Sequence, residues 1–400
     1  MPSFIQIGEG YKAGSSITGG CALWNLGFRP FYLFAAIFAA IAIAVWVAHF
    51  SGMLAFGTYL RDPLWHAHEM IFGYAFAIVV GFLFTAVRNW SGKPTPSGKV
   101  LLLIVALWLE ARVLLLLALP IPALYFDLAF AIAAAFGIAM PLKAGGNRRN
   151  YFFVLLLLAI GIANGAFSLA IVGAIAVSPR QMLGVALDLV LIIMVVMGGR
   201  VIPMFTASAL PQSRPKRPPL LEMLAIVSVV MLLAADVLAV PAPLIGCVAA
   251  LAAMAHGARL LLWQPWHTVR RPILWILHLA YAWIVVHLAL RSVAAWVPGV
   301  SSLATHALTV GGIGGLTLGM MTRTARGHTG RPLVAEKGEV TIYMLIQVAS
   351  VVRVFLPLAA PQMLMAAVGW SGALWVAAFV IFVVKYAPFL WRPRLDGKSA

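Results

Sequence analysis

The stretch Arg61–Pro94 reads RDPLWHAHEMIFGYAFAIVVGFLFTAVRNWSGKP and decides the fold class. Asp62 is a suitable N-cap and Pro63 fits the first helical position, so a helix is predicted to start here. About twenty mostly apolar residues follow before Arg88, which is the length that crosses the hydrocarbon core of a bilayer. The stretch therefore predicts a transmembrane helix.

The first turns of this helix carry His66, His68 and Glu69. Such groups are costly in lipid and commonly mark an ion, proton or cofactor site, although interfacial histidines that reach water are the alternative. On a helix the two histidines point about 160° apart, whereas Glu69 shares the side of His66. We expect the helix to face two centres, His68 toward one and His66 with Glu69 toward the other. Glu69 would hold His66 by a hydrogen bond or pass protons.

The composition indicates that the whole chain, and not this one helix alone, belongs to the membrane. Of 400 residues, 63% are hydrophobic and 10% are charged, and the mean hydropathy is +1.00. A soluble fold could not bury so much apolar surface, so the chain is predicted to be an all-α polytopic membrane protein. Cys21 and Cys247 lack CxxC spacing and are predicted not to form a disulfide.

Twelve apolar runs are separated by Pro, Gly or basic clusters, and each predicts one transmembrane helix. The basic residues fall in alternate loops, so the positive-inside rule accounts for the net charge of +17 and places both termini in the cytoplasm. No nucleic-acid partner is needed. Residues 1–27 and 389–400 are predicted to be cytoplasmic tails, the first of them not a signal peptide. The predicted spans are 30–51, 64–88, 100–119, 122–142, 151–176, 182–206, 220–239, 242–262, 272–296, 303–321, 339–358 and 363–386.

The sequence also contains an internal repeat. Residues 81–94 (GFLFTAVRNWSGKP) match residues 319–332 (GMMTRTARGHTGRP) at a shift of 238, which superposes His68 on His306. The middle third matches more faintly. We predict three tandem four-helix repeats, 28–148, 149–270 and 271–388, in parallel orientation because each has an even number of spans. The alternative is chance similarity among apolar segments.

The repeat places three polar residues at equivalent outer positions of the second, sixth and tenth spans. These are His68, Asp188 and His306. If the three spans pack innermost around a pseudo-threefold axis, the side chains converge, and two imidazoles with a carboxylate suit non-haem iron, copper or zinc. This predicts a metal site near the outer face.

Four further histidines are candidate ligands. His256 and His278 lie at similar depth near the inner ends of neighbouring spans, an arrangement that can hold haem, with structural hydrogen bonding as the alternative. His287 and His49 lie in outer parts of the ninth and first spans and could join the outer site. His49 could equally be interfacial, and His287 a core residue.

Seven motifs resemble, in order, those of the NnrS family, across nearly the whole chain. The resemblance implies a bacterial inner-membrane protein that contains haem and copper and is linked to denitrification and nitric oxide stress. It implies that His66, His68, His278, His306 and His328 are the family's motif histidines, with loop capping as the alternative for His328. The motifs are FRPF at 28–31, WHAHEMIFG at 65–73, NWSG at 89–92, GGRVIPMFT at 198–206, LHLAYAW at 277–283, HALTVG at 306–311 and GHTGRP at 327–332.

The leading hypothesis is therefore reduction of nitric oxide to nitrous oxide at haem b paired with copper or non-haem iron. His68 and His306 would be the first metal ligands, His66 the next, and His278 the haem ligand. Glu69 or Asp188 would deliver protons. The chain lacks a CxxCH motif and a cysteine set for an iron–sulfur cluster, so electrons would come from quinol or a protein donor. The alternatives are a non-catalytic protein that binds or senses nitric oxide, and a transporter of a small molecule or metal.

Overall fold

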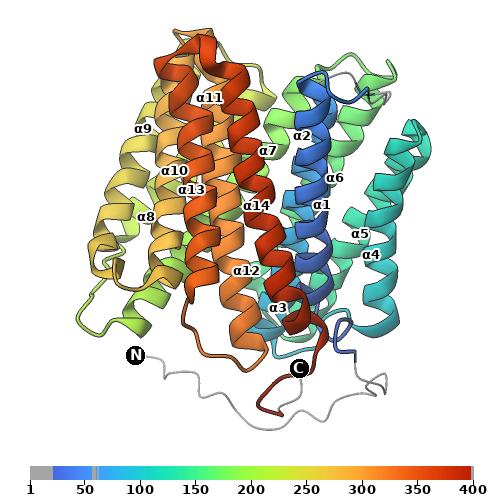
Figure 1. Ribbon diagram of the computed structural model, residues 1–400, viewed down its shortest axis with the longest axis vertical. Helices are drawn as coiled ribbons and strands as arrows, with labels where there is room; N and C mark the ends of the chain where they lie inside the picture. The colour runs from blue at the N-terminus through green and yellow to red at the C-terminus, as the bar shows by residue number, and fades with distance from the viewer. Residues whose placement is uncertain (1–20, 56–59, 61–62, 398–400) are drawn as a thin grey trace.

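The protein, described here from a computed structural model over residues 21–55, 60 and 63–397, is built from helices, with no strand in these ranges (Figure 1). Its elements are α1 (Phe28–Phe50), α2 (Leu64–His68), η1 (Glu69–Ala75), α3 (Phe76–Ser91), α4 (Gly98–Leu116), α5 (Pro120–Ala144), η2 (Arg148–Asn150), α6 (Phe152–Ile171), α7 (Pro179–Ala209), α8 (Pro219–Val237), α9 (Ala242–Leu262), η3 (Pro265–Thr268), α10 (Pro272–Ala294), η4 (Pro298–Val300), α11 (Ser301–His306), η5 (Ala307–Gly314), α12 (Gly315–His328), α13 (Lys337–Ala359), η6 (Pro361–Met363) and α14 (Leu364–Trp391).

These elements join into twelve long rods, which correspond to the twelve predicted spans. Within the described ranges, eleven are long and apolar enough to cross a membrane. The twelfth, α4, has a comparable length but carries Lys99, Glu110 and Arg112. The predicted class of all-α polytopic membrane protein is confirmed. The predicted cap Asp62 lies outside the described residues, and α2 begins at Leu64.

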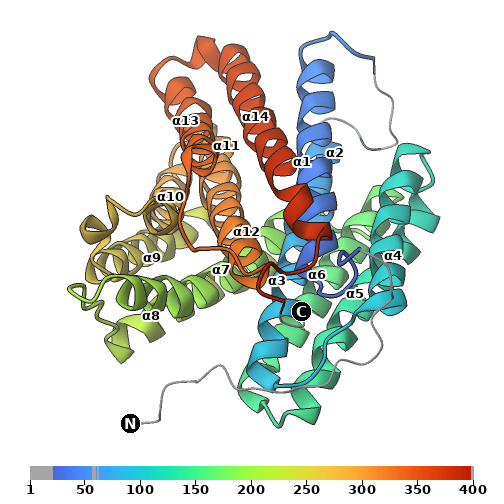
Figure 2. The ribbon, with the colours of Figure 1, turned by 60° about the horizontal axis from the view of Figure 1, so that its bottom comes forward.

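The rods form a closed ring of three four-helix groups. Each group's last helix packs against the first helix of the next: α5 on α6, α9 on α10, and α14 on α1. Figure 2 shows α3, α7 and α12, one helix from each group, near the middle of the bundle. This is the arrangement that three tandem repeats would form, and the division into repeats remains a prediction.

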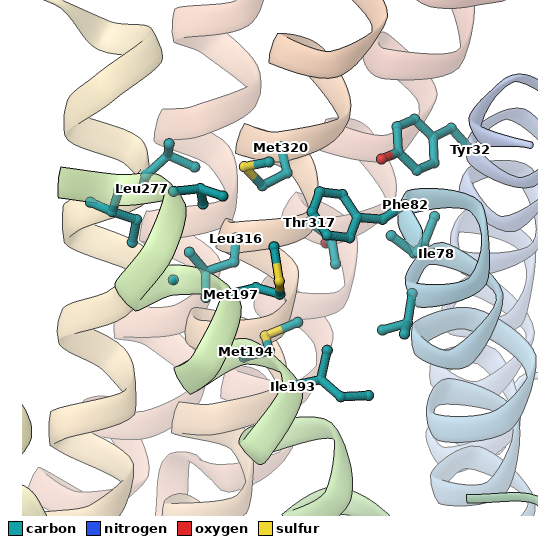
Figure 3. Close-up of a pocket in the computed structure, with 14 residues that line it drawn as sticks. Tyr32, Ile78, Phe82, Ile193, Met194, Met197, Leu277, Leu316, Thr317 and Met320 are labelled. Carbon is teal, nitrogen blue, oxygen red and sulfur yellow. The ribbon is translucent and has the colours of Figure 1, made fainter. Parts of the chain in front are cut away.

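The three central rods are the most buried, because they contact neighbours on every side. In α7 and in the α2–α3 rod, 83% of the most apolar window is buried, against 22% in the peripheral α8. Between α3, α7 and α12, with α1 and α10 alongside, lies a cavity of about 70 Å³ (Figure 3). Its lining is almost wholly apolar and includes Met194, Met197 and Met320.

The basic loops lie at one end of the bundle, at the bottom of Figure 1, where α1 begins and α14 ends. We call this the inner end and the opposite end the outer end. The cytoplasmic position of the inner end rests on the positive-inside rule and remains a prediction.

Candidate functional site

Two π-helical segments mark the outer halves of the central rods. The segment η1 follows His68 directly, and η5 follows His306. The two starting points are 238 residues apart, which is the shift of the sequence repeat. Because π-helical turns are rare and concentrate at functional sites, their recurrence at equivalent positions directs attention to the side chains beside them.

Glycines allow these segments to pack closely. A Cβ atom at Gly73 would lie 2.6 Å from Cε1 of Phe38, and one at Gly311 would lie 2.2 Å from Cγ of Trp283. The carbonyl of Gly73 also accepts a hydrogen bond of 2.8 Å from the Trp108 indole. Both glycines therefore serve helix packing, and Gly311 faces a tryptophan side chain.

His66 and His306 lie beside each other at the outer end. Their ring centroids are 6.4 Å apart and the planes differ by 9°. Trp46 stacks on the other face of His66 at 4.9 Å. Nδ1 of His306 donates to the carbonyl of Ser302 at 2.7 Å, and Nη2 of Arg353 donates to Nε2 at 3.2 Å. The first and third four-helix groups thus bring two predicted ligands together in one aromatic column.

His68 points away from this column into a buried polar network. Its Nδ1 lies 2.8 Å from Oε1 of Glu69, and its Nε2 lies 2.8 Å from Oδ1 of Asn164. Arg112 joins Glu69, at 2.7 Å, to Asp127. All five side chains are at most 5% exposed. A buried network of this kind is stable only when every member is paired.

The predicted assignment of side chains to two centres is therefore wrong for Glu69, and whether either place is a metal or cofactor centre stays a prediction. His66 and His68 do face different neighbours. Glu69, however, pairs with His68 and not with His66. The carboxylate of Glu69 is held on this side because its Oε1 also accepts a hydrogen bond of 2.7 Å from Arg112, so the ion pair and not helical phase sets its direction.

Asp188 belongs to a separate group of ion pairs that joins the second and third four-helix groups. Nη1 of Arg291 lies 2.7 Å from Oδ1 of Asp188, and Nη2 lies 2.7 Å from Oδ1 of Asp236. This corrects the expectation that His68, Asp188 and His306 converge, because each is held by a different partner. Over the described part of the chain, no group of three His, Cys, Asp or Glu side chains is placed to hold a metal ion.

His256 is fully engaged in hydrogen bonds between α8, α9 and α10. Its Nε2 donates to the carbonyl of Ala225 at 3.0 Å, so Nδ1 accepts from the Tyr281 hydroxyl at 2.6 Å. That hydroxyl in turn accepts from Arg259 at 2.8 Å. The expected pairing of His256 with His278 on one haem iron is therefore not formed, since His256 has no free lone pair.

His278 has one nitrogen available. The Thr206 hydroxyl donates to the Ile202 carbonyl, so Nε2 of His278 donates to that hydroxyl at 2.9 Å. Nδ1 then carries the lone pair, and it is buried without a hydrogen-bond partner among the described residues. It is the one predicted haem ligand whose donor atom is free.

The remaining histidines make local contacts. His287 donates from Nδ1 to the carbonyl of Ala304, which leaves the lone pair of Nε2 buried without a partner among the described residues, so its role as a ligand stays a prediction. His49 contacts the carbonyl of Leu54. His328 packs its ring on Phe28 at 5.6 Å and its carbonyl accepts a hydrogen bond from Arg394. These contacts place His49 and His328 at opposite ends of the bundle.

Sequence reasoning did not find Asn164, the partner of His68, or the contact between Arg353 and His306. Asn164 stands alone as an amide in the apolar run FFVLLLLAIGIANGAFSLAI of α6. A single strongly polar residue inside a membrane span is a usable signal. Arg353 carries the same signal in α13, but its partner His306 could not be predicted, because the contact depends on how α13 packs against α11.

The central cavity is suited to small apolar molecules. At about 70 Å³ it is well below the volume of about 300–1,000 Å³ typical of sites for larger ligands, so it has no room for a porphyrin. Thr317 and Tyr32 are its polar lining residues, and Thr317 already donates to backbone carbonyls. A small neutral gas would fit this volume, beside the Tyr32 hydroxyl, which is buried without a hydrogen-bond partner among the described residues.

Comparison with known proteins identifies a family for this chain. The sequence profile of the family described as NnrS protein matches residues 22–394, which is nearly the whole chain. No curated protein matches the sequence. The chain therefore belongs to the NnrS family, and this membership fits a membrane protein linked to nitric oxide, as the motifs predicted.

Proposed function

We propose that this protein consumes nitric oxide within the membrane, and that the reacting centre lies at His66 and His306. The observation that carries the proposal is the stacking of these two imidazoles, brought from different four-helix groups to one place at the outer end. Family membership supplies the link to nitric oxide. The apolar cavity farther down the central rods suits a neutral gas that dissolves in lipid.

The two imidazoles match copper or non-haem iron in donor type, since both ions accept imidazole nitrogen. Arg353 opposes this, because its guanidinium donates to Nε2 of His306 and would repel a cation. Binding would require Arg353 to turn away from that nitrogen. A bound metal of this kind would supply electron transfer to nitric oxide.

Haem b remains part of the proposal through the free Nδ1 of His278. The central cavity, which the neighbouring Leu277 lines, is too small for a porphyrin, so the haem does not fit there. We assign no step of the reaction to it.

The proposed reaction joins two molecules of nitric oxide with two electrons and two protons to give nitrous oxide and water. Quinol or a protein donor would supply the electrons. Glu69 lies three residues from His66 and is bonded to His68, so this pair would hold a proton near the centre. Asp188 shares Arg291 with Asp236, which is partly exposed and gives a second route from the outer surface.

The test uses single variants His66→Ala and His306→Ala, with His49→Ala as the matched control at the same end. Purified protein is assayed for bound copper, iron and haem, and membranes are assayed for nitric oxide loss and nitrous oxide formation with quinol as donor. Each site variant is expected to lose metal affinity and turnover by roughly tenfold or more, while the control retains both. Normal metal content and turnover in both site variants would refute the site.

A second candidate is a protein that binds nitric oxide without turnover. It is favoured by the contact between Arg353 and His306, because both nitrogens of His306 are then engaged and this histidine offers no lone pair to a redox metal. The same assays separate the two. Uptake that stops at one equivalent of nitric oxide per protein, with no nitrous oxide, identifies the binding protein.

A further inference from the structure

The motifs FRPF at 28–31 and GHTGRP at 327–332 are not used by the proposed function, and they meet at the inner end. The rings of Phe28 and His328 are 5.6 Å apart. The chain beyond α14 joins them, because the amide of Leu395 donates to the carbonyl of Thr329. Two motifs nearly 300 residues apart and the end of the last helix therefore form one surface.

Arg29 is the buried centre of this surface, with 0% of its area exposed. Its Nη1 caps the end of α14 by donating to the carbonyls of Leu390, at 2.7 Å, and Arg392, at 2.9 Å. Its Nε and Nη2 are buried and have no hydrogen-bond partner among the described residues. Capping thus accounts for one nitrogen and leaves the opposite edge of the guanidinium unused.

The surroundings of that edge are strongly positive. Arg331 and Arg394 are near enough to act on the charge of Arg29, and Arg88 and Arg394 act on His328. The carboxylate in this surface is Asp396, and it already pairs with Arg394 at 2.6 Å. Burial and the charges of Arg326 and Arg392 lower the pKa of Arg331, which lies in the loop after α12.

An unpaired buried N–H group costs about 1–3 kcal/mol, and neighbouring cations add repulsion. Both costs would be removed by an anion. The Nε–Nη2 edge presents two parallel donors, a fork that fits two oxygens of one phosphate group. Arg29 is the second residue of a membrane span, so this edge lies at the depth of lipid head groups.

We propose that the inner end holds a phosphate-binding site, with Arg29 as its buried base and Arg331 and Arg394 at its rim. The phosphate belongs to an anionic phospholipid or to free phosphate in the cytoplasm. Basic pockets between helices on the cytoplasmic side of membrane proteins bind lipid head groups in this way. The bound group would tie α1, α12 and the end of α14 together.

The test uses full-length protein in nanodiscs of phosphatidylcholine alone, as wild type, Arg331→Gln, Arg394→Gln and the control Arg148→Gln. Arg148 is an exposed arginine of another inner loop, so the control makes the same charge change on the same face. One arm titrates inorganic phosphate and follows the melting temperature. The other arm adds phosphatidylglycerol and follows both the melting temperature and lipid retention by native mass spectrometry.

We expect saturable stabilisation of the wild type and of Arg148→Gln, and a loss of affinity of roughly tenfold or more in the two rim variants. A response in the first arm identifies free phosphate, and a response in the second alone identifies the lipid. Arg29→Lys keeps the charge but loses the fork, so it should weaken binding further. No saturable response in either arm, or equal loss in Arg148→Gln, would overturn the proposal and indicate diffuse surface charge.

Discussion

The segments α2–η1 and α11–η5 share one backbone arrangement, but their side chains contact different residues. Each ends a short α-helix at a histidine and continues as a π-helix that contains a tightly packed glycine. In the first, His68 and Glu69 enter a buried network with Arg112. In the second, Ala307 stands where Glu69 stands in the first, and His306 remains at the outer end beside His66.

A comparison of Arg112 with Arg353 shows the consequence of this difference for buried charge. Arg112 bridges two carboxylates, so its charge is balanced inside the bundle. Among the described residues, Arg353 of α13 pairs with no carboxylate and donates to His306. Each arginine keeps one buried N–H group without a partner there, Nε of Arg112 and Nη1 of Arg353. The first segment therefore stabilises the fold, whereas the second leaves a histidine and an arginine for interaction with something else.

The largest effect is expected for Arg112→Met. The substitution leaves the carboxylates of Glu69 and Asp127 buried without a counter-charge, which should lower the free energy of unfolding by about 3–5 kcal/mol. Denaturant unfolding of the purified protein, followed by tryptophan fluorescence, measures the change. Glu110→Gln on the exposed face of α4 is the control. A change within about 1 kcal/mol for Arg112→Met would mean that the network is not a stabilising element.

An intermediate effect is expected for Gly311→Ala. The new methyl group would overlap Trp283, which is held by a hydrogen bond of 2.8 Å from its indole to Gln347. We expect a loss of about 1–3 kcal/mol in the same unfolding assay. Gly73→Ala should cost less, because it meets the edge of the Phe38 ring, which makes no such hydrogen bond. The reverse order would show that the two segments are packed differently from this description.

The smallest effect on stability is expected for Arg353→Met. The guanidinium makes one hydrogen bond, to a partly exposed histidine, and leaves a buried N–H group unpaired, so its removal should change the free energy of unfolding by no more than about 1 kcal/mol. Metal binding is the sharper measurement. Without the competing cation, copper affinity at His66 and His306 should rise. If Arg353→Met binds less copper than the wild type, the arginine supports the site and does not oppose it.

The positions of the helices could be predicted from the sequence, because each membrane span needs a long apolar run of its own. Length and hydropathy located the helices, and the shift of 238 equals the spacing of the two π-helical segments that the structure shows. The assignment of the inner end from the basic loops stays a prediction. The motif residues also identified the family. Partners of individual side chains were less predictable. Helical phase paired Glu69 with His66, but the ion pair with Arg112 holds its carboxylate beside His68.

The sequence by itself thus determined the class of protein, the number and order of its helices and the family, because each follows from apolar length, charge placement or motif order along the chain. The tertiary structure alone decided that His66 meets His306, that His68 meets Asn164, and that Arg29 lies among other arginines. Those contacts join helices that are distant in sequence, and they depend on how the rods rotate and close into a ring, which no local pattern specifies.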